Sequence, residues 1–309
     1  MTDMKAVRIH AYGGPEVLEY EDAPRPAPQQ GEILVRVHAA GINPVDWKVR
    51  EGYLKDVWPA QFPLILGYDV AGTVEEVGAN VTEFAIGDAV FSMIRGGGYA
   101  EYAAFPVKDA ARKPQTLDFV QTASLPVAAL TAWQALFDHA HLEDGQSVLI
   151  HAASGGVGHL AVQFAKNKGA HVIATASAHN HDFVRSLGAD EVIDYNTTQF
   201  EDVVHDVDVV LDTIGGDTQE RSWGVLKPGG MLVSIVSPDT EKQAQAHNRR
   251  GVNMHAEENA AQLAEIAALA DAGKVKPSVE RVFPLAETRE AQEVSQGGHV
   301  RGKIVLQVA

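Results

Sequence analysis

A run of small residues follows a short apolar segment near the middle of the chain. The apolar segment is Ser147–Ile150, and Ala152, Gly155 and Gly158 then give the spacing A-x-x-G-x-x-G. Small residues let the backbone turn tightly after a strand, let a pyrophosphate approach the amide N–H groups, and let the next helix pack closely. The N-terminus of that helix adds partial positive charge beside the diphosphate. The spacing predicts a phosphate-binding turn made of Ser154, Gly155, Gly156, Val157 and Gly158; a tight turn without a ligand is the alternative.

The end of the second predicted strand indicates which dinucleotide binds. NAD-binding versions of this unit commonly carry an acidic residue there, which accepts hydrogen bonds from the ribose hydroxyls. Here the strand ends in Ser177, and His179, His181 and Arg185 follow. A serine hydroxyl donates to a 2′-phosphate that an acid would repel, so we predict NADPH as the cofactor. Two alternatives stay open: Ser177 merely caps the next helix, and neutral histidines would leave only a modest preference for NADPH.

The elements that must position these residues alternate between strands and helices. The strand-like runs are SVLIH, HVIAT, EVIDY, VDVVLDT and GGMLVSIVS, with GVNMHA as a candidate sixth. Such alternation predicts a parallel sheet covered by helices on both faces. The first 115 or so residues instead hold short β-branched runs broken by Gly, Pro and Asn, and the strand-like runs VERVFPL and KIVLQV lie near the chain's end. We expect this last segment to rejoin the first domain.

Composition excludes several classes of function. The 309 residues carry 25 Lys plus Arg against 41 Asp plus Glu, a formal net charge of −16, which disfavours nucleic-acid binding. No cysteine is present, so disulfides, thiolate catalysis and cysteine-ligated metals are excluded. The sequence has no long apolar run and no apolar signal core at its start, so we expect no membrane span and a cytoplasmic location. The close histidine pairs, His139 with His141 and His179 with His181, lack a third ligand at a recognisable spacing.

Several blocks of the sequence, in the same order, resemble the zinc-independent quinone oxidoreductases of the medium-chain dehydrogenase/reductase superfamily. They include MKAVRIHAYGGPEVLEYED, AAGINPVDWKVREG, PLILGYDVAGTVEEVG, LPVAALTAWQAL, LGADEVIDY and HVRGKIVL. The resemblance implies an α/β protein with a GroES-like β-rich catalytic domain and a Rossmann domain built on a doubly wound parallel sheet. Residues 1–120 would begin the catalytic domain, 121–273 would form the Rossmann NADP-binding domain, and 274–309 would return to the catalytic domain. The active site is then expected in the cleft between them.

The residues at the positions of a catalytic metal are the main departure from zinc-dependent relatives. In those relatives a cysteine and a histidine of the first domain hold the metal. The matching stretches here carry Asn43 and Asp46, and Tyr68 and Asp69. These residue types predict no metal site. Without zinc, alcohol oxidation lacks its Lewis acid, whereas reduction of an electron-poor acceptor depends less on one.

The resemblance therefore implies hydride transfer from NADPH to a quinone or to the β-carbon of an α,β-unsaturated carbonyl. Asn43, Tyr53 and Tyr68 are the candidate catalytic residues, and Trp47 is a candidate pocket wall. Ordinary packing is the alternative for the aromatic residues. Water is an alternative proton donor. Further cofactor contacts are expected, by resemblance and from their places at strand ends, at Thr131, Tyr195, Ile214, Val236, Ser237 and Lys303.

Two other functions stay open. One is an enoyl reductase acting on a thioester-linked substrate, although the sequence shows no basic cluster for a carrier. The other is a non-catalytic NADPH-binding protein with a structural or sensory role. The expected partners are a small-molecule quinone or enone and a second copy of the chain. By resemblance, a homodimer would form through the edge strand near GGMLVSIVS.

Overall fold

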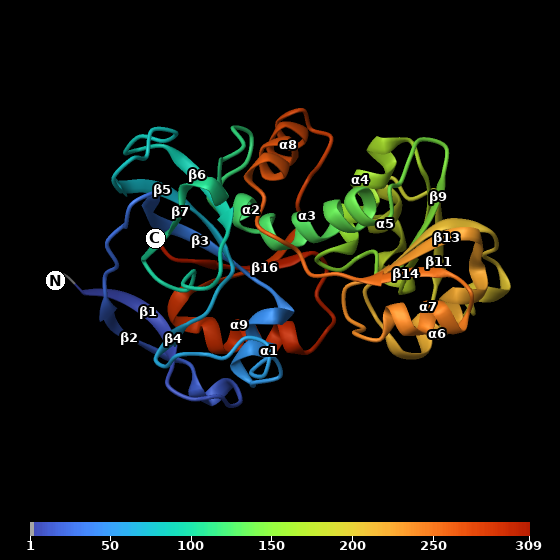
Figure 1. Ribbon diagram of the computed structural model, residues 1–309, viewed down its shortest axis with the longest axis horizontal. Coiled ribbons are helices and arrows are strands. Elements are labelled where there is room, and N and C mark those ends of the chain that lie inside the picture. Colours follow the sequence, from blue (N-terminus) through green and yellow to red (C-terminus); the bar gives the residue numbers. More distant parts are fainter. Residues whose placement is uncertain (1–2) are drawn as a thin grey trace. The chain divides into compact units, whose positions relative to one another are not determined.

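Two compact units make up the chain (Figure 1). The computed structural model describes residues 3–309. Unit 1 comprises the chain up to Val127 together with Glu258–Gly273 and Pro277–Ala309. Unit 2 comprises Ala128–Glu257 and Lys274–Lys276. In the described part of the chain, no helix has the length and apolar character needed to cross a membrane.

Unit 1 is built on two sheets, as the β-rich opening of the sequence predicted. The smaller sheet has the order β2-β1-β4, and the larger has the order β15-β16-β3-β5-β6-β8, with β7 also paired to β3. The strands are β1 (Asp3–Ile9), β2 (Glu19–Pro24), β3 (Glu32–Ile42), β4 (Leu64–Ile65), β5 (Asp69–Val77), β6 (Ala89–Met93), β7 (Tyr102–Pro106), β8 (Ala110–Arg112), β15 (Val279–Pro284) and β16 (Lys303–Gln307).

The last strand completes the larger sheet, as expected. In Figure 1 the red β16 lies beside the blue β3, and the two pair antiparallel with Ile304 opposite Ile42. β3 also pairs antiparallel with β5, with Ala39 opposite Ala71. These registers bring the first residue of β16, the residue after β3 and the first residue of β5 to one end of the sheet.

Four helices belong to unit 1: α1 (Pro44–Arg50), α2 (Phe119–Ala123), α8 (Ala260–Asp271) and α9 (Thr288–Gln296). The sequence placed α8 in the second domain, but the structure groups it with unit 1. It packs against β8, and Asp271 at its C-terminus accepts hydrogen bonds from Thr116 N at 2.9 Å and Thr116 Oγ1 at 3.0 Å. An amphipathic helix read alone does not show which sheet it covers, which is why this grouping was not predicted.

Unit 2 is a doubly wound parallel sheet, which confirms the predicted α/β fold. Its strand order is β11-β10-β9-β12-β13-β14. The strands are β9 (Ser147–Ile150), β10 (His171–Ala176), β11 (Glu191–Asp194), β12 (Val207–Asp212), β13 (Leu226–Ser234) and β14 (Arg250–Asn253), and every pairing is parallel. In such sheets ligands bind at the carboxyl ends of the strands, where the order reverses. The edge strands are β11 and β14, and β14 is the one next to β13, which contains most of the segment GGMLVSIVS.

Helices of unit 2 follow the strands in sequence. They are α3 (Pro126–Trp133), whose residues from Ala128 onward belong to this unit, the π-helical turn Gln134–His139, α4 (Gly158–Lys168), α5 (His181–Ser186), α6 (Gly216–Ser222) and α7 (Thr240–Ala246). Short 3-10 turns elsewhere in the chain are Pro15–Val17, Val107–Asp109, Ala178–Asn180, Phe200–Asp202, Trp223–Val225 and Leu285–Glu287. α4 ends at Gly169, whose left-handed backbone (φ 92°) suits a residue without a side chain.

Candidate functional site

The glycine-rich turn in unit 2 lies between β9 and α4, as predicted. Gly155 N donates to Ala152 O at 2.9 Å, and Ala152 has a left-handed φ of 46°. A Cβ on Gly158 would lie 2.4 Å from Ala152 O and 2.7 Å from Ala153 Cα. A Cβ on Gly155 would approach Ala152 O at 3.3 Å, with no other heavy atom recorded within 4 Å. Gly158 therefore serves close backbone packing, whereas Gly155 leaves open the space in which a pyrophosphate approaches the backbone.

A side chain that the sequence did not single out connects this turn to the end of β10. Asn180 Nδ2 donates to Ser154 Oγ at 3.2 Å and to Ser177 Oγ at 3.3 Å. The two predicted cofactor residues Ser154 and Ser177 thus share one amide. His179 follows and is exposed, while the Arg185 guanidinium lies 3.7 Å from the Asp182 carboxylate. Ser177 takes the place of the acid at the end of β10, and the choice between NADPH and NADH stays a prediction.

Beneath the turn, His151 is a buried neutral group. It lies 3.1 Å from Thr175 Oγ1 and 2.9 Å from Ser222 Oγ. Burial lowers the pKa of His151 to about 4. The imidazole therefore ties β9 to β10 and α6 without adding charge to the site.

Exposed apolar side chains follow the carboxyl ends of three strands of this sheet. Tyr195 after β11 is 57% exposed and Ile214 after β12 is 52% exposed, and Val236 after β13 is also exposed. Large apolar groups at this edge of a doubly wound sheet fit the bases and riboses of a dinucleotide. Ser237 follows Val236 at the same strand end. The structure places all four after strand ends, and their contacts with a cofactor stay a prediction.

The loops that carry these residues are shaped by two buried side chains that the sequence did not single out. Asp212 Oδ1 accepts from Ile214 N at 3.0 Å and Gly215 N at 2.8 Å. Asp212 Oδ2 accepts from Ser234 Oγ at 2.8 Å, and that Oγ in turn accepts from Ser237 N at 3.1 Å. Thr131, also predicted as a cofactor contact, lies in α3 and is buried. Its cofactor role stays a prediction.

The candidate catalytic residue Asn43 belongs to a buried polar group in unit 1. Asn43 Nδ2 donates to Asp69 Oδ2 at 2.7 Å, and Lys303 Nζ donates to Asn43 Oδ1. Lys303 Nζ also lies 3.3 Å from Asp69 Oδ2, and Asp69 Oδ1 accepts from Val127 N at 2.6 Å. Asn43 is 4% exposed, Lys303 3% and Asp69 fully buried. Lys303 was predicted to contact cofactor phosphates; the structure places its ammonium in this group, and the phosphate role stays untested.

A second set of buried groups lies beside Asn43. Asp46 Oδ2 accepts from the Asn43 backbone N at 2.6 Å. Within residues 3–309, Asp46 Oδ1, the Tyr99 hydroxyl and Gln292 Nε2 are buried and lack a hydrogen-bond partner of good geometry. Burial raises the pKa of Asp46 to about 7, and the nearby Asp69 carboxylate adds to that rise. Burial, with a smaller effect from Asp46, also raises the pKa of Tyr68.

Replacing Asp46 with asparagine is expected to change how stability depends on pH. The folded pKa of about 7 exceeds the ordinary 3.8, so the folded state holds a proton that the unfolded state releases between those pH values. The contribution of Asp46 to the free energy of unfolding therefore falls as pH rises toward 7. In denaturant titrations, the free energy of unfolding of Asp46→Asn minus that of wild type should increase by about 2–3 kcal/mol between about pH 5 and pH 8. A pH-independent difference, equal to that of the exposed control Asp56→Asn, would contradict this assignment.

The third candidate, Tyr53, lies outside the buried group. It is 68% exposed, in the segment after α1, and its ring lies edge-on to Trp47 with centroids 6.2 Å apart. Of the three predicted catalytic residues, the structure thus places Asn43 and Tyr68 near Asp46, and Tyr53 on the surface of unit 1.

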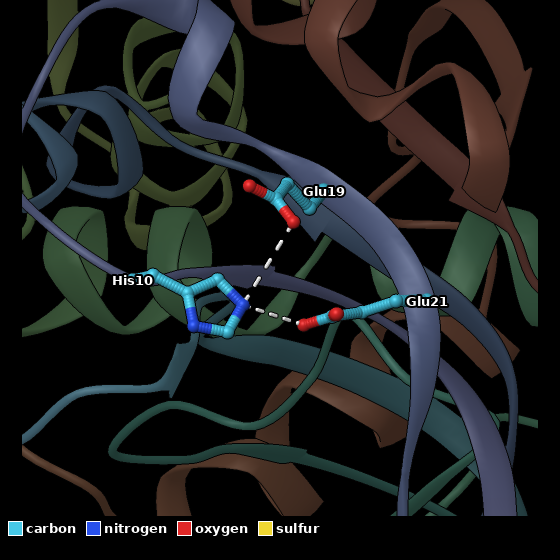
Figure 2. A group of neighbouring side chains, drawn as sticks. All are labelled: His10, Glu19 and Glu21. Atoms are coloured by element: carbon cyan, nitrogen blue, oxygen red, sulfur yellow. Dashed lines mark hydrogen bonds and ion pairs between the residues drawn. The ribbon is translucent and has the colours of Figure 1, made fainter.

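A possible metal-binding group lies on the smaller sheet of unit 1. Within residues 3–309, His10, Glu19 and Glu21 are the one set of three such side chains whose donor atoms lie within 4.8 Å of one another (Figure 2). His10 Nε2 is 2.8 Å from Glu21 Oε1 and 3.9 Å from Glu19 Oε2. Arg8 Nε also donates to Glu21 Oε1 at 2.6 Å. Because this guanidinium already compensates Glu21, the group is a mixed ion-pair cluster that disfavours a further cation.

Comparison with known proteins agrees with this architecture. Residues 29–115 match the alcohol dehydrogenase GroES-like domain, and residues 187–306 match the zinc-binding dehydrogenase family. The chain is 37% identical to the chloroplast envelope quinone oxidoreductase homolog of Arabidopsis thaliana, over 98% of each protein.

Solved structures agree as well. The quinone oxidoreductase from Coxiella burnetii matches with a TM-score of 0.92 and 38% identity over 100% of both chains. The CurK enoyl reductase matches with a TM-score of 0.92 and 29% identity over 99% of both chains. Mycobacterial Rv1454c complexed with NADPH matches with a TM-score of 0.89 and 30% identity, over 99% of this chain and 100% of that one. The chain is therefore an oxidoreductase of NAD(P)H-binding fold that belongs to the quinone oxidoreductase branch of the medium-chain dehydrogenase/reductase superfamily.

Proposed function

We propose that the protein is an NADPH-dependent oxidoreductase that transfers hydride to a quinone or an α,β-unsaturated carbonyl without a catalytic metal. The observation that carries the proposal is the glycine-rich turn whose neighbouring strand, β10, is followed by Ser177 in place of an acid. The close backbone packing at Gly158 shapes the turn, and the open space at Gly155 fits a bound pyrophosphate. The match to a relative solved with NADPH supports the choice of cofactor.

The side chains around Ser177 favour NADPH over NADH. Ser177 Oγ, which accepts from the Asn180 amide, supplies a hydroxyl donor, and His179 stands beside it. Residues 177–181, which directly follow β10, include no acid that would repel a 2′-phosphate. Arg185 faces Asp182, so the preference rests more on donors than on a dedicated cation.

Replacing Ser177 with aspartate is expected to shift the preference from NADPH toward NADH. The new carboxylate would repel the 2′-phosphate and accept from the ribose hydroxyls of NADH. The ratio of Kd for NADH to Kd for NADPH, measured by fluorescence titration, should fall at least about tenfold, or 1.4 kcal/mol. Ser186→Asp, a serine exposed on α5, is the matched control. If NADH already binds the wild type as tightly as NADPH does, and Ser177→Asp leaves the ratio unchanged, the assignment of Ser177 is wrong.

Residue types in unit 1 support metal independence. The two stretches that align with the metal ligands of zinc-dependent relatives contribute Asn43 and Asp69 to the buried group. Neither residue offers the thiolate or imidazole that zinc prefers, and the Lys303 ammonium already contacts both of them. These contacts fit an acceptor that accepts hydride without a Lewis acid.

The proposed mechanism divides the work between the two units. When bound, the reduced nicotinamide supplies the hydride. Unit 2 binds and orients the cofactor through the glycine-rich turn and the strand ends. In unit 1, Asn43 Nδ2 carries a second N–H that can donate to the oxygen on which negative charge develops. Water then protonates the product oxyanion or enolate, so no side chain has to lose its proton.

One solved relative favours a second candidate function. The CurK enoyl reductase is as similar in fold as the Coxiella protein, so reduction of a thioester-linked enoyl group is the alternative activity. A panel of 1,4-benzoquinone, 9,10-phenanthrenequinone, short 2-alkenals and crotonyl-coenzyme A separates the classes. The proposal predicts that quinones or alkenals have the highest kcat/KM. A higher kcat/KM with crotonyl-coenzyme A would favour the alternative, and tight NADPH binding without turnover would favour a non-catalytic role.

The assembly proposed for the protein rests on the family resemblance, and its proposed location rests on the sequence alone. We expect a homodimer joined through the β14 edge of the unit 2 sheet, beside β13. A monomeric mass by light scattering at micromolar concentration would contradict this. We also expect a cytoplasmic location.

A further inference from the structure

The Lys303 ammonium is buried at a position where an apolar side chain would avoid the desolvation penalty of a charge. It begins β16, is 3% exposed, and contacts Asn43 Oδ1 and Asp69 Oδ2. Removing an ammonium and a carboxylate from water has a large desolvation penalty, which their attraction offsets only when further hydrogen bonds complete the group. Replacement of such pairs by apolar residues is often neutral or stabilising. Packing alone therefore does not account for this pair.

The pair fixes both ends of one amide. Asn43 Oδ1 accepts from Lys303, and Asn43 Nδ2 donates to Asp69 at 2.7 Å. With the amide held this way, its oxygen is occupied and its second N–H is directed away from Asp69. That second N–H is the donor that the Asn43 side chain offers to a further group.

The backbone is shaped to let Asp69 reach this amide. A Cβ on Gly41 would lie 2.5 Å from Asp69 Oδ2 and 2.4 Å from Ala123 O. Only glycine at this place in β3 leaves room for the carboxylate, which Val127 N holds from the other side at 2.6 Å. The group is thus built from β3, β5 and β16 together with the start of α3.

We propose that Lys303 is a positioning residue that, through Asn43, supplies the positive charge for stabilising the oxyanion formed on the acceptor. This role rests on the proposed function, and it makes Lys303 the residue that strengthens the Asn43 N–H as a hydrogen-bond donor. An ammonium on the amide oxygen draws electron density from the nitrogen, so the free N–H becomes a better donor. Asp69 holds the ammonium and the amide in register.

The charges balance without proton loss from Lys303. Hydride adds to the acceptor carbon, a C–H bond forms, and the π electron pair moves to the acceptor oxygen. The acceptor gains two electrons and the nicotinamide is oxidised. The Asn43 N–H donates to the new oxyanion, which water later protonates, and Lys303 remains an ammonium throughout.

A purely structural ion pair is the competing explanation, and a phenolate probe separates the two. 4-Nitrophenol presents one phenolic hydroxyl on a benzene ring, as a hydroquinone does at each of its two oxygens. Its absorbance reports whether it is bound as phenol or phenolate. The measurement is the apparent pKa of the probe bound to the full-length protein saturated with NADP⁺. The variants are Lys303→Gln, which keeps a neutral donor near Asn43 Oδ1, and the double variant Lys303→Met with Asp69→Asn, which removes both charges.

The matched control is the double variant Lys227→Met with Asp208→Asn. It removes an ion pair of unit 2 that lies at the start of β12 and β13, the end of the sheet opposite the carboxyl ends. Thermal unfolding and NADPH titration of every variant report folding and cofactor binding independently of turnover.

We expect both Lys303 variants to raise the apparent pKa of bound 4-nitrophenol by about one unit, a tenfold loss of preference for the phenolate. Quinone reduction should fall at least about tenfold, with NADPH affinity and the control variant unchanged. An unchanged probe pKa in Lys303→Gln, or a wild type that does not favour the phenolate, would overturn the inference. A wild type that favours the phenolate but oxidises NADPH with no acceptor would instead contradict the proposed function while supporting the role of Lys303.

Discussion

Replacing Asn43 with alanine is expected to lower kcat/KM for quinone reduction by NADPH about a hundredfold or more, the usual effect of losing one donor to a developing oxyanion. The substitution removes the amide that links Lys303 to Asp69. The ammonium and the carboxylate remain paired, so unit 1 should still fold. Steady-state kinetics with 9,10-phenanthrenequinone, together with NADPH titration, measures the effect.

The control for this loss is an asparagine with a structural hydrogen bond elsewhere. Asn167 Nδ2 donates to Lys274 O at 2.8 Å at the exposed end of α4, and Asn167→Ala should leave kcat/KM near the wild-type value. NADPH should bind Asn43→Ala as tightly as wild type. A folded Asn43→Ala variant with wild-type turnover would remove Asn43 from the catalytic residues.

Replacing Gly158 with alanine is expected to destabilise unit 2 by about 2–3 kcal/mol or more and to abolish NADPH binding. The new Cβ would lie within 2.7 Å of two backbone atoms, Ala152 O and Ala153 Cα, and neither can rotate away. The β9–α4 turn must then shift, and the amide groups that receive the pyrophosphate shift with it. Chemical denaturation and NADPH titration report the two effects separately.

Gly155→Ala separates the effect on NADPH binding from the effect on stability. Its Cβ would meet one backbone atom at 3.3 Å, so the protein should fold with nearly unchanged stability. The methyl group would still occupy the space of the pyrophosphate, and NADPH affinity should fall at least about tenfold. Gly155→Ala with wild-type affinity for NADPH would show that the turn does not approach the diphosphate.

The cofactor half of the protein was largely predictable because its signals are local. The spacing of Ala152, Gly155 and Gly158 directly after an apolar run identifies the turn, and the residue types at the next strand end suggest the cofactor. Asn180 was not predicted because a polar residue in a helical turn shows no sign of its partners. Asp212 is the exception that could have been found, since a carboxylate at the end of a buried strand needs donors nearby.

The catalytic half was less predictable because its contacts are distant in sequence. Lys303 lies 260 residues from Asn43 and 234 residues from Asp69, and only the pairing of β16 with β3 brings them together. Read alone, a lysine before a terminal strand is equally suited to a phosphate or to solvent. Asp46 was seen as a replacement for a metal ligand, but its burial and raised pKa depend on the packing of β3, α1 and α9.

The most direct test of the central claim is the rate of NADPH oxidation by 9,10-phenanthrenequinone in a protein treated with a strong chelator and dialysed into metal-free buffer. Metal content is measured on the same sample. The account predicts turnover equal to that of the untreated protein, with NADPH preferred over NADH. Loss of turnover that stoichiometric zinc restores would contradict it, because a metal would then supply the charge assigned here to Lys303 and Asn43.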